Sequence, residues 1–162
     1  MTKPTHSIVR IALVSMAIWL TGISAPAQQW KVAEKDVPAA VIAAFKSAYP
    51  TATIKGYARE KVDGKVFYEI ESKEGNTGRD VLYNPDGTVA EIEETVATSD
   101  LPIAAQELIR SKYPRAVVAR AEKITEKTAQ GDKAGYEVIA KQGKKRFTLE
   151  FDADGKLRSK AK

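Results

Sequence analysis

The chain has 162 residues, of which 43% are hydrophobic and 29% charged, and its formal net charge is +5. This apolar content is ordinary for a globular protein and suffices for one compact domain or two small lobes. Cysteine is absent, and the only histidine is His6. The rest of the chain therefore lacks the residues for Ser-His-Asp or Cys-His catalysis and for zinc sites of the usual nitrogen and sulfur type. The composition argues against an enzyme, and we expect no cofactor and no metal site.

The first 27 residues have the three-part layout of a secretory signal peptide, with a basic start, an apolar run and small residues at the end. The apolar run covers residues 11–23 and is shorter than the roughly 20 residues that an α-helix needs to cross a bilayer. Ala25 and Ala27 stand at the −3 and −1 positions of a cleavage site before Gln28. We expect a mature chain of residues 28–162, periplasmic or secreted, without a stable membrane span. The alternative is an uncleaved membrane anchor.

The sequence after the signal repeats itself. Residues 36–55 match residues 100–119 with seven identities in twenty columns. Further along, Tyr-Glu-Ile at residues 68–70 is matched by Tyr-Glu-Val at residues 136–138, and the offset has grown by four. The extra residues are expected in a polar, solvent-exposed loop at residues 128–133. A repeat of this length indicates two copies of one structural unit.

Each copy is expected to begin with a helix and to continue as strands. Apolar residues recur every four positions within residues 37–49 and 101–113, which is typical of a helix with one buried face. Alternating apolar and polar residues follow, as in half-buried strands. We therefore predict an α+β fold of two tandem units, each a helix packed on a small antiparallel β-meander. The units would cover residues 36–99 and 100–162, after an N-terminal linker at residues 28–35.

Two tight turns are predicted between consecutive strands. Asn-Pro-Asp-Gly at residues 84–87 and Asp-Ala-Asp-Gly at residues 152–155 place glycine where a positive φ is needed. The second motif also resembles the start of a calcium-binding loop, but the twelfth position of such a loop would fall beyond the last residue. Both motifs are therefore interpreted as hairpin turns.

These motifs together resemble PepSY-like domains: a helix with proline near its start and Tyr-Pro at its end, a Tyr-Glu-Ile or Tyr-Glu-Val strand, and an Asp-Gly hairpin. Their tandem arrangement behind a signal peptide, over residues 36–160, is similar to the beta-lactamase-inhibitor-like, PepSY-like periplasmic proteins. The resemblance implies an exported, non-catalytic binding module that acts by protein–protein contact, as an inhibitor or regulator of an envelope hydrolase or sensor. An alternative is a periplasmic protein that binds a small ligand, a metal ion, a polyanion or lipid.

Four aromatic residues are candidates for contact with a protein partner: Phe67, Tyr57, Tyr83 and Tyr136. Aromatic side chains on an open sheet face often anchor interfaces, whereas core packing is the alternative for each of them. Phe67 is the best candidate because it alternates with Tyr68 and therefore points to the opposite face of its strand.

Charge is divided unevenly between the two copies. Residues 36–99 carry 7 basic and 11 acidic residues, and residues 100–162 carry 15 and 9. The basic run Lys144, Lys145 and Arg146 is a candidate site for anionic lipid headgroups, a polyanion or an acidic protein. A basic hairpin tip without a ligand is the alternative. Nucleic acid is not expected, because no stacking aromatics are interleaved with these residues.

The acidic residues of the first copy suggest two further interpretations. Glu69 and Glu71 lie two apart on one strand, about 6–7 Å from each other, within the range of a glycosidase pair. We expect instead a solvent-exposed strand face, because a sugar cleft with aromatic walls is not evident. Glu91, Glu93 and Glu94 would protect an edge strand from pairing with another chain.

Overall fold

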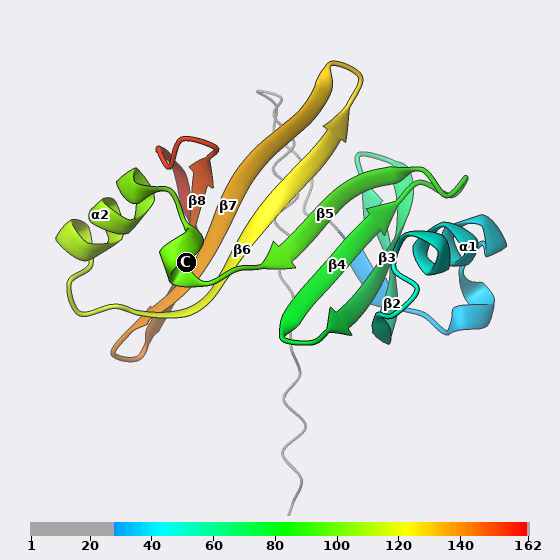
Figure 1. Ribbon diagram of the computed structural model, residues 1–162, viewed down its shortest axis with the longest axis horizontal. Coiled ribbons are helices and arrows are strands. Elements are labelled where there is room, and N and C mark those ends of the chain that lie inside the picture. Colours follow the sequence, from blue (N-terminus) through cyan, green and yellow to red (C-terminus); the bar gives the residue numbers. More distant parts are fainter. Residues whose placement is uncertain (1–27, 162) are drawn as a thin grey trace, which may run out of the picture.

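The computed structural model describes residues 28–161, and its main feature is one antiparallel sheet of nine strands in chain order (Figure 1). The strands are β1 (Gln28–Lys31), β2 (Thr53–Val62), β3 (Lys65–Glu74), β4 (Thr77–Tyr83), β5 (Val89–Thr95), β6 (Val117–Thr128), β7 (Gly131–Gln142), β8 (Lys145–Asp152) and β9 (Leu157–Ala161). Each strand pairs with the next one along the chain, so every connection within the sheet is short except the two that carry a helix, between β1 and β2 and between β5 and β6.

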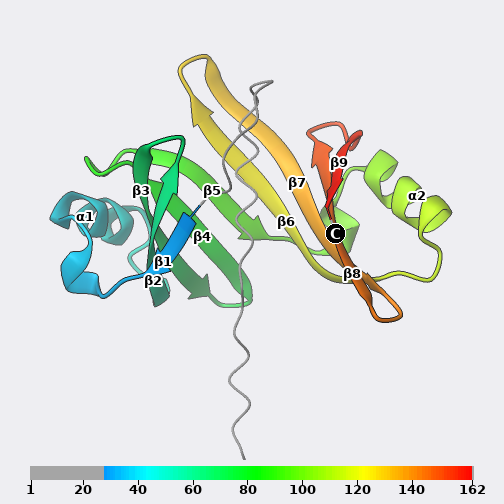
Figure 2. The ribbon, with the colours of Figure 1, turned by 180° about the vertical axis from the view of Figure 1, so that it is seen from behind.

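Two helices of ten residues each pack against this sheet. Helix α1 (Ala39–Ala48) follows the 3-10 turn η1 (Glu34–Asp36), and helix α2 (Ile103–Lys112) follows η2 (Thr98–Asp100). A proline precedes each helix, where its missing N–H and fixed φ cost nothing. The helices lie at opposite ends of the molecule in both views (Figures 1 and 2).

The apolar stripes predicted for the two helices are confirmed. Val37, Val41 and Phe45 are buried in a core with the β-strand residues Ile70 and Tyr83. Burial of a side chain of this size stabilises the folded state by about 1.5–3 kcal/mol.

The second helix builds a separate core in the same way. Ala105 and Ile109 pack with Val138, Leu149 and Phe151. The alternation of apolar residues along β8 places its large side chains on one face, under α2. Each helix therefore stabilises its own half of the sheet.

The register shows that both helices cover the same face of the sheet. Ile70, under α1, lies in line with Ile92 of β5 and Thr125 of β6 through direct strand pairs. Ala121, under α2, is four residues from Thr125 on the same strand and shares its face. The opposite face carries no helix of the described residues, and we call it the helix-free face.

The prediction of an α+β fold built from two tandem helix-on-meander units is wrong. Strand β5 pairs directly with β6 over five positions, from Glu91 opposite Glu126 to Thr95 opposite Glu122. This pairing joins the two halves into a single, strand-dominated sheet and satisfies the N–H and C=O groups that separate units would leave exposed at their edges. A repeat in the sequence indicates the internal pattern of each copy but not the pairing between copies.

The structure also differs from three smaller expectations. Residues 28–35 are not only a linker, because β1 pairs with β2. Residues 129–133 are exposed, as expected for a polar loop at residues 128–133, but they form the end of a long hairpin in which Thr128 pairs with Gly131. The four extra residues of the second copy lengthen β6 and β7. Because β5 is an interior strand, its glutamates do not protect an edge.

Both predicted hairpin turns are confirmed. Gly87 and Gly155 have φ values of +88° and +82°, and each donates its N–H to the carbonyl at the start of its turn, on Asn84 and Asp152. A Cβ atom on Gly87 would lie 2.8 Å from the carbonyl oxygen of Ala40 in α1. Each turn therefore packs closely against the start of a helix, which only glycine allows.

Candidate functional site

The helix-free face carries most of the interior carboxylates of the sheet. Residues that pair directly across antiparallel strands share a face, so the register identifies them. They come from seven consecutive strands and form what we call the acidic face: Glu60, Glu69, Glu71, Asp80, Glu91, Glu93, Glu122, Glu126, Glu137 and Glu150.

Several of these carboxylates are directly opposite one another. Glu71 of β3 pairs with Asp80 of β4, which pairs with Glu93 of β5. Directly opposite side chains have Cβ atoms about 4.5–5.5 Å apart, and like charges at that distance are destabilising. The sheet therefore holds a row of three carboxylates at an energetic cost.

A second row crosses the other half of the sheet. Glu122, Glu137 and Glu150 are directly opposite one another on β6, β7 and β8. Glu91 and Glu126 form a further pair across the junction between β5 and β6. Sites at which a sequence departs from what favours folding are expected to be functional, and these rows are such a departure.

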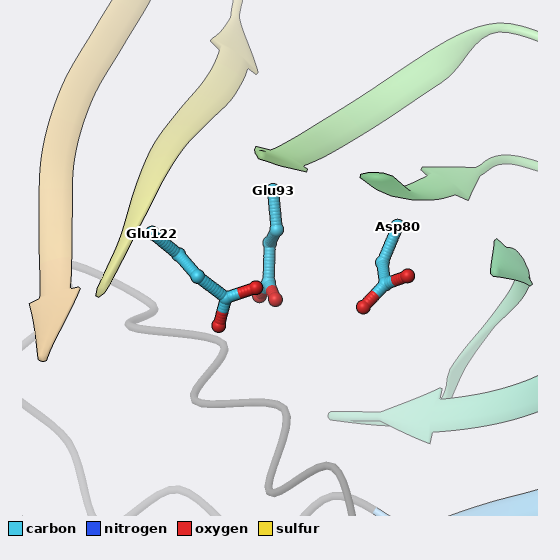
Figure 3. Close-up of side chains that lie close together, drawn as sticks. All are labelled: Asp80, Glu93 and Glu122. Carbon is cyan, nitrogen blue, oxygen red and sulfur yellow. The ribbon is translucent and has the colours of Figure 1, made fainter. Parts of the chain in front are cut away.

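The two rows meet at the junction between β5 and β6. Carboxylate oxygens of Asp80, Glu93 and Glu122 lie within 4.8 Å of one another, and Figure 3 shows the three side chains converging from β4, β5 and β6. The guanidinium group of Arg120 contacts Glu122 and lies 3.2 Å from Oδ2 of Asp80. Arg120 therefore offsets part of the charge of Asp80 and Glu122.

A small cavity lies next to this cluster. It has a volume of about 10 Å³ and is lined by Glu69, Asp80, Leu82, Glu91 and Glu93. This volume is near the smallest that holds one water molecule. The cavity therefore has room for a single small species, surrounded by four carboxylates.

Burial of these carboxylates favours their protonated forms. Burial raises the pKa of Glu69 to about 9, and the charge of Glu60 adds to this effect. Burial also raises the pKa of Glu91 to about 7, with a further contribution from the charge of Glu126. Near neutral pH, this part of the acidic face therefore holds carboxyl groups in both protonation states.

The central cluster shows the same effect. Burial, followed by the charges of Glu91 and Glu122, raises the pKa of Glu93 well above its usual range. Burial raises the pKa of Glu122 to about 7, although the Arg120 guanidinium acts in the opposite direction. Because these carboxylates are crowded and buried, the cluster binds protons more readily than exposed carboxylates do.

An apolar patch adjoins the carboxylates on the helix-free face. Val62, Phe67 and Leu82 form a buried cluster there, and Ala90 packs against it. Phe67, the best partner candidate from the sequence, thus lies on the face without a helix, as its alternation with Tyr68 indicated. Its side chain is 7% exposed.

The other three aromatic candidates lie on the helix-covered face. Tyr83 is fully buried in the first core, so its side chain is not exposed to a partner. Tyr57 packs beside that core and donates its hydroxyl to Oε2 of Glu34, 2.9 Å away. Tyr136 packs against the second core. The structure therefore does not bring the four aromatic candidates together.

The remaining predicted sites lie at the end of a hairpin or outside the described residues. Lys144, Lys145 and Arg146 are exposed at the hairpin between β7 and β8, and their role as an anion site stays a prediction. Ala27 lies outside the described residues, and Gln28 begins β1. Cleavage between them also stays a prediction.

The expectation of a solvent-exposed strand face around Glu69 is wrong. Glu69 is 2% exposed, and its Oε2 accepts a hydrogen bond from Gln29. The repeat contained a signal for this burial, because Glu69 and Glu137 occupy the same place in the two copies and both are buried. Each is flanked by core residues, as in Tyr68-Glu69-Ile70.

Comparison with protein families identifies the family of the chain. Its residues 17–90 and 68–159 match the model of the beta-lactamase-inhibitor-like, PepSY-like family. The chain belongs to this family. The resemblance inferred from the motifs is therefore confirmed for this PepSY-like chain, and no curated protein shows significant similarity to it.

Solved structures with the same fold come from Bacteroides species. A BLIP-like protein from Bacteroides fragilis is 23% identical, with 76% of this chain and 85% of that chain covered and a TM-score of 0.57. A protein described as periplasmic from Bacteroides eggerthii is 15% identical, with 77% and 88% covered and a TM-score of 0.64. At these identities the likeness shows the fold. Within the described part of the PepSY-like chain, no helix is long and apolar enough to span a membrane.

Proposed function

We propose that this PepSY-like protein is an exported, non-catalytic binding module that acts by protein–protein contact through its helix-free face. Its partner would be an envelope hydrolase or sensor that it inhibits or regulates. The observation that carries the proposal is the acidic face, in which carboxylates oppose one another directly across the strands.

The charge of this face favours a partner rich in lysine and arginine. A partner cation beside Glu126 or Glu150 would add to the compensation that Lys133, directly opposite Glu126, and the nearby Arg158 supply. Complementary charge also accelerates association and discriminates against other partners.

Two observations support a role without catalysis. Residues 28–162 contain no histidine and no cysteine. Glu69 lines the cavity of about 10 Å³, whereas Glu71 lines a separate groove between α1 and β2. The two carboxyl groups of the suggested glycosidase pair therefore do not face one common cleft, which hydrolysis of a sugar between them would require.

The support for export is the signal-like sequence of residues 1–27 together with the relatives described as periplasmic. Fractionation of the source cells tests this part of the proposal. The protein is expected in the periplasmic fraction with a mass that corresponds to residues 28–162. Retention in the cytoplasm would contradict it.

Capture from an envelope extract with charge-reversed variants tests the binding proposal. We expect one protein to bind in stoichiometric amounts and to crosslink to residues of the helix-free face. Glu126→Lys and Glu150→Lys should abolish its capture, whereas Glu107→Lys on the exposed side of α2 applies the same charge change elsewhere and should not. Capture that persists in both face variants would refute the role of the acidic face.

A further inference from the structure

We propose that Asp80, Glu93 and Glu122 form a binding site for a calcium ion at the junction between β5 and β6. The inference goes beyond the proposed function and does not depend on it. The site would join the two halves of the sheet, because β4 and β5 belong to the half under α1 and β6 to the half under α2.

The spacing of the carboxylates suits calcium. One oxygen from each residue lies within 4.8 Å of the other two. Oxygens that bind the same calcium ion at about 2.3–2.6 Å can lie up to about 5 Å apart, so this spacing fits calcium. Three carboxylates from separate strands can reach one calcium ion with little movement of the backbone (Figure 3).

A second, independent observation points to a cation at this place. Glu69 is 2% exposed, and its Oε1 has no hydrogen-bond partner among the described residues. The same side chain lines the small cavity together with Asp80 and Glu93. A buried carboxylate oxygen without a partner is costly, and a cation in or beside this cavity would remove that cost.

The charge balance leads to the same conclusion. Asp80, Glu93, Glu122 and Glu69 bring four carboxylates together, and Arg120 supplies one positive charge to two of them. A divalent cation would compensate more of the remaining charge than any rearrangement of Arg120.

Arg120 provides a direct test of the calcium site. Its guanidinium group holds two of the three ligands, so it competes with calcium for the same carboxylate groups. Removal of this group should weaken the fold in the absence of calcium and strengthen the binding of calcium. A purely ion-paired network predicts the first effect without the second.

Calcium titration of the purified protein, by calorimetry and by thermal melting, tests the site. We expect one bound ion per chain and a rise in Tm of about 8 °C at a calcium concentration one hundred times the Kd. Sodium chloride of equal ionic strength should not reproduce this rise. Glu93→Gln and Asp80→Asn should each weaken calcium binding at least tenfold, and Glu107→Gln on α2 should leave it unchanged.

Arg120→Gln provides the decisive comparison, because its calcium affinity should exceed that of the wild-type protein. Absence of any calcium-dependent change in Tm, or an equal change in wild type and Glu93→Gln, would overturn the proposal. Capture of a protein partner in calcium and in chelator separates this site from the proposed function. A partner that binds equally in both would leave that function standing while the calcium site is judged by the titration alone.

Discussion

Asp80 and Glu93 are directly opposite one another on β4 and β5, on the face of the sheet that no described helix covers. Two like charges in this arrangement destabilise the folded protein. Glu93→Gln keeps the shape of the side chain and removes one charge. We expect it to raise the free energy of unfolding by about 0.5–1 kcal/mol in the presence of a chelator, at alkaline pH where the Glu93 carboxyl group with its raised pKa is ionised. Urea denaturation measures the change, with Glu107→Gln as a control expected to lie near zero.

The raised pKa values of the acidic face predict a particular dependence of stability on pH. A carboxyl group whose pKa is higher in the folded than in the unfolded state binds more protons when folded, so stability falls as pH rises between the two values. For Glu91 and Glu122 the window runs from about 4.5 to about 7, and for Glu69 to about 9. We therefore expect Tm to decrease from pH 5 to pH 9.

Glu69→Gln isolates the contribution of one group to this profile. The variant has no ionisable group at that position, so the decrease in Tm between pH 7 and pH 9 should become shallower. A wild-type profile that rises over this range would show that the acidic face is not protonated as the raised pKa of Glu69 indicates.

The turn at Gly87 predicts a contrast between two glycine substitutions. Gly87 and Gly64 have similar φ values of +88° and +82°, but only at Gly87 would a Cβ atom lie close to backbone, 2.8 Å from the carbonyl oxygen of Ala40. Gly64→Ala should cost about 1 kcal/mol from backbone strain. Gly87→Ala should cost about 3 kcal/mol because the turn must also move away from α1.

Chemical denaturation of both glycine variants measures this difference. Equal losses of stability would mean that the hairpin does not press against the helix. A larger loss in Gly64→Ala would contradict the contact between Gly87 and Ala40 outright.

The continuous sheet predicts cooperative unfolding. Because β5 and β6 pair over five positions, the halves under α1 and α2 should unfold together in one transition. Calorimetry tests this through the ratio of the calorimetric to the van't Hoff enthalpy, which should be close to one. Thr125→Pro removes a donor from the middle of β6 and is expected to lower the melting temperature. Two transitions in the wild-type protein would show that the halves are independent.

Local features of this fold could be predicted from the sequence, because they depend on neighbours in the chain. The burial of Val41 and Phe45 follows from a four-residue spacing, and the turn at Gly87 follows from its own conformational requirement. The pairing of β5 with β6 could not be predicted in this way. It depends on two strands separated by α2, and neither strand has a sequence pattern that identifies the other as its pairing partner.

The candidate site was missed for the same reason. Asp80, Glu93 and Glu122 lie far apart in the sequence and converge only through the register of three strands. Each of them, taken alone, is indistinguishable from an exposed acidic residue on a strand. The one available hint was the glutamate between core residues in both copies, at Glu69 and Glu137, which indicates a carboxylate held against an apolar environment.

The strand order leaves β1 and β9 as the two outer margins of the sheet. Both are short, and they carry Lys31, Arg158 and Lys160. Lysine and arginine at such margins oppose the addition of a strand from another molecule. The pairing of β5 with β6 already extends the sheet across both halves. The charged margins protect it from further strand addition and from fibre formation at high concentration.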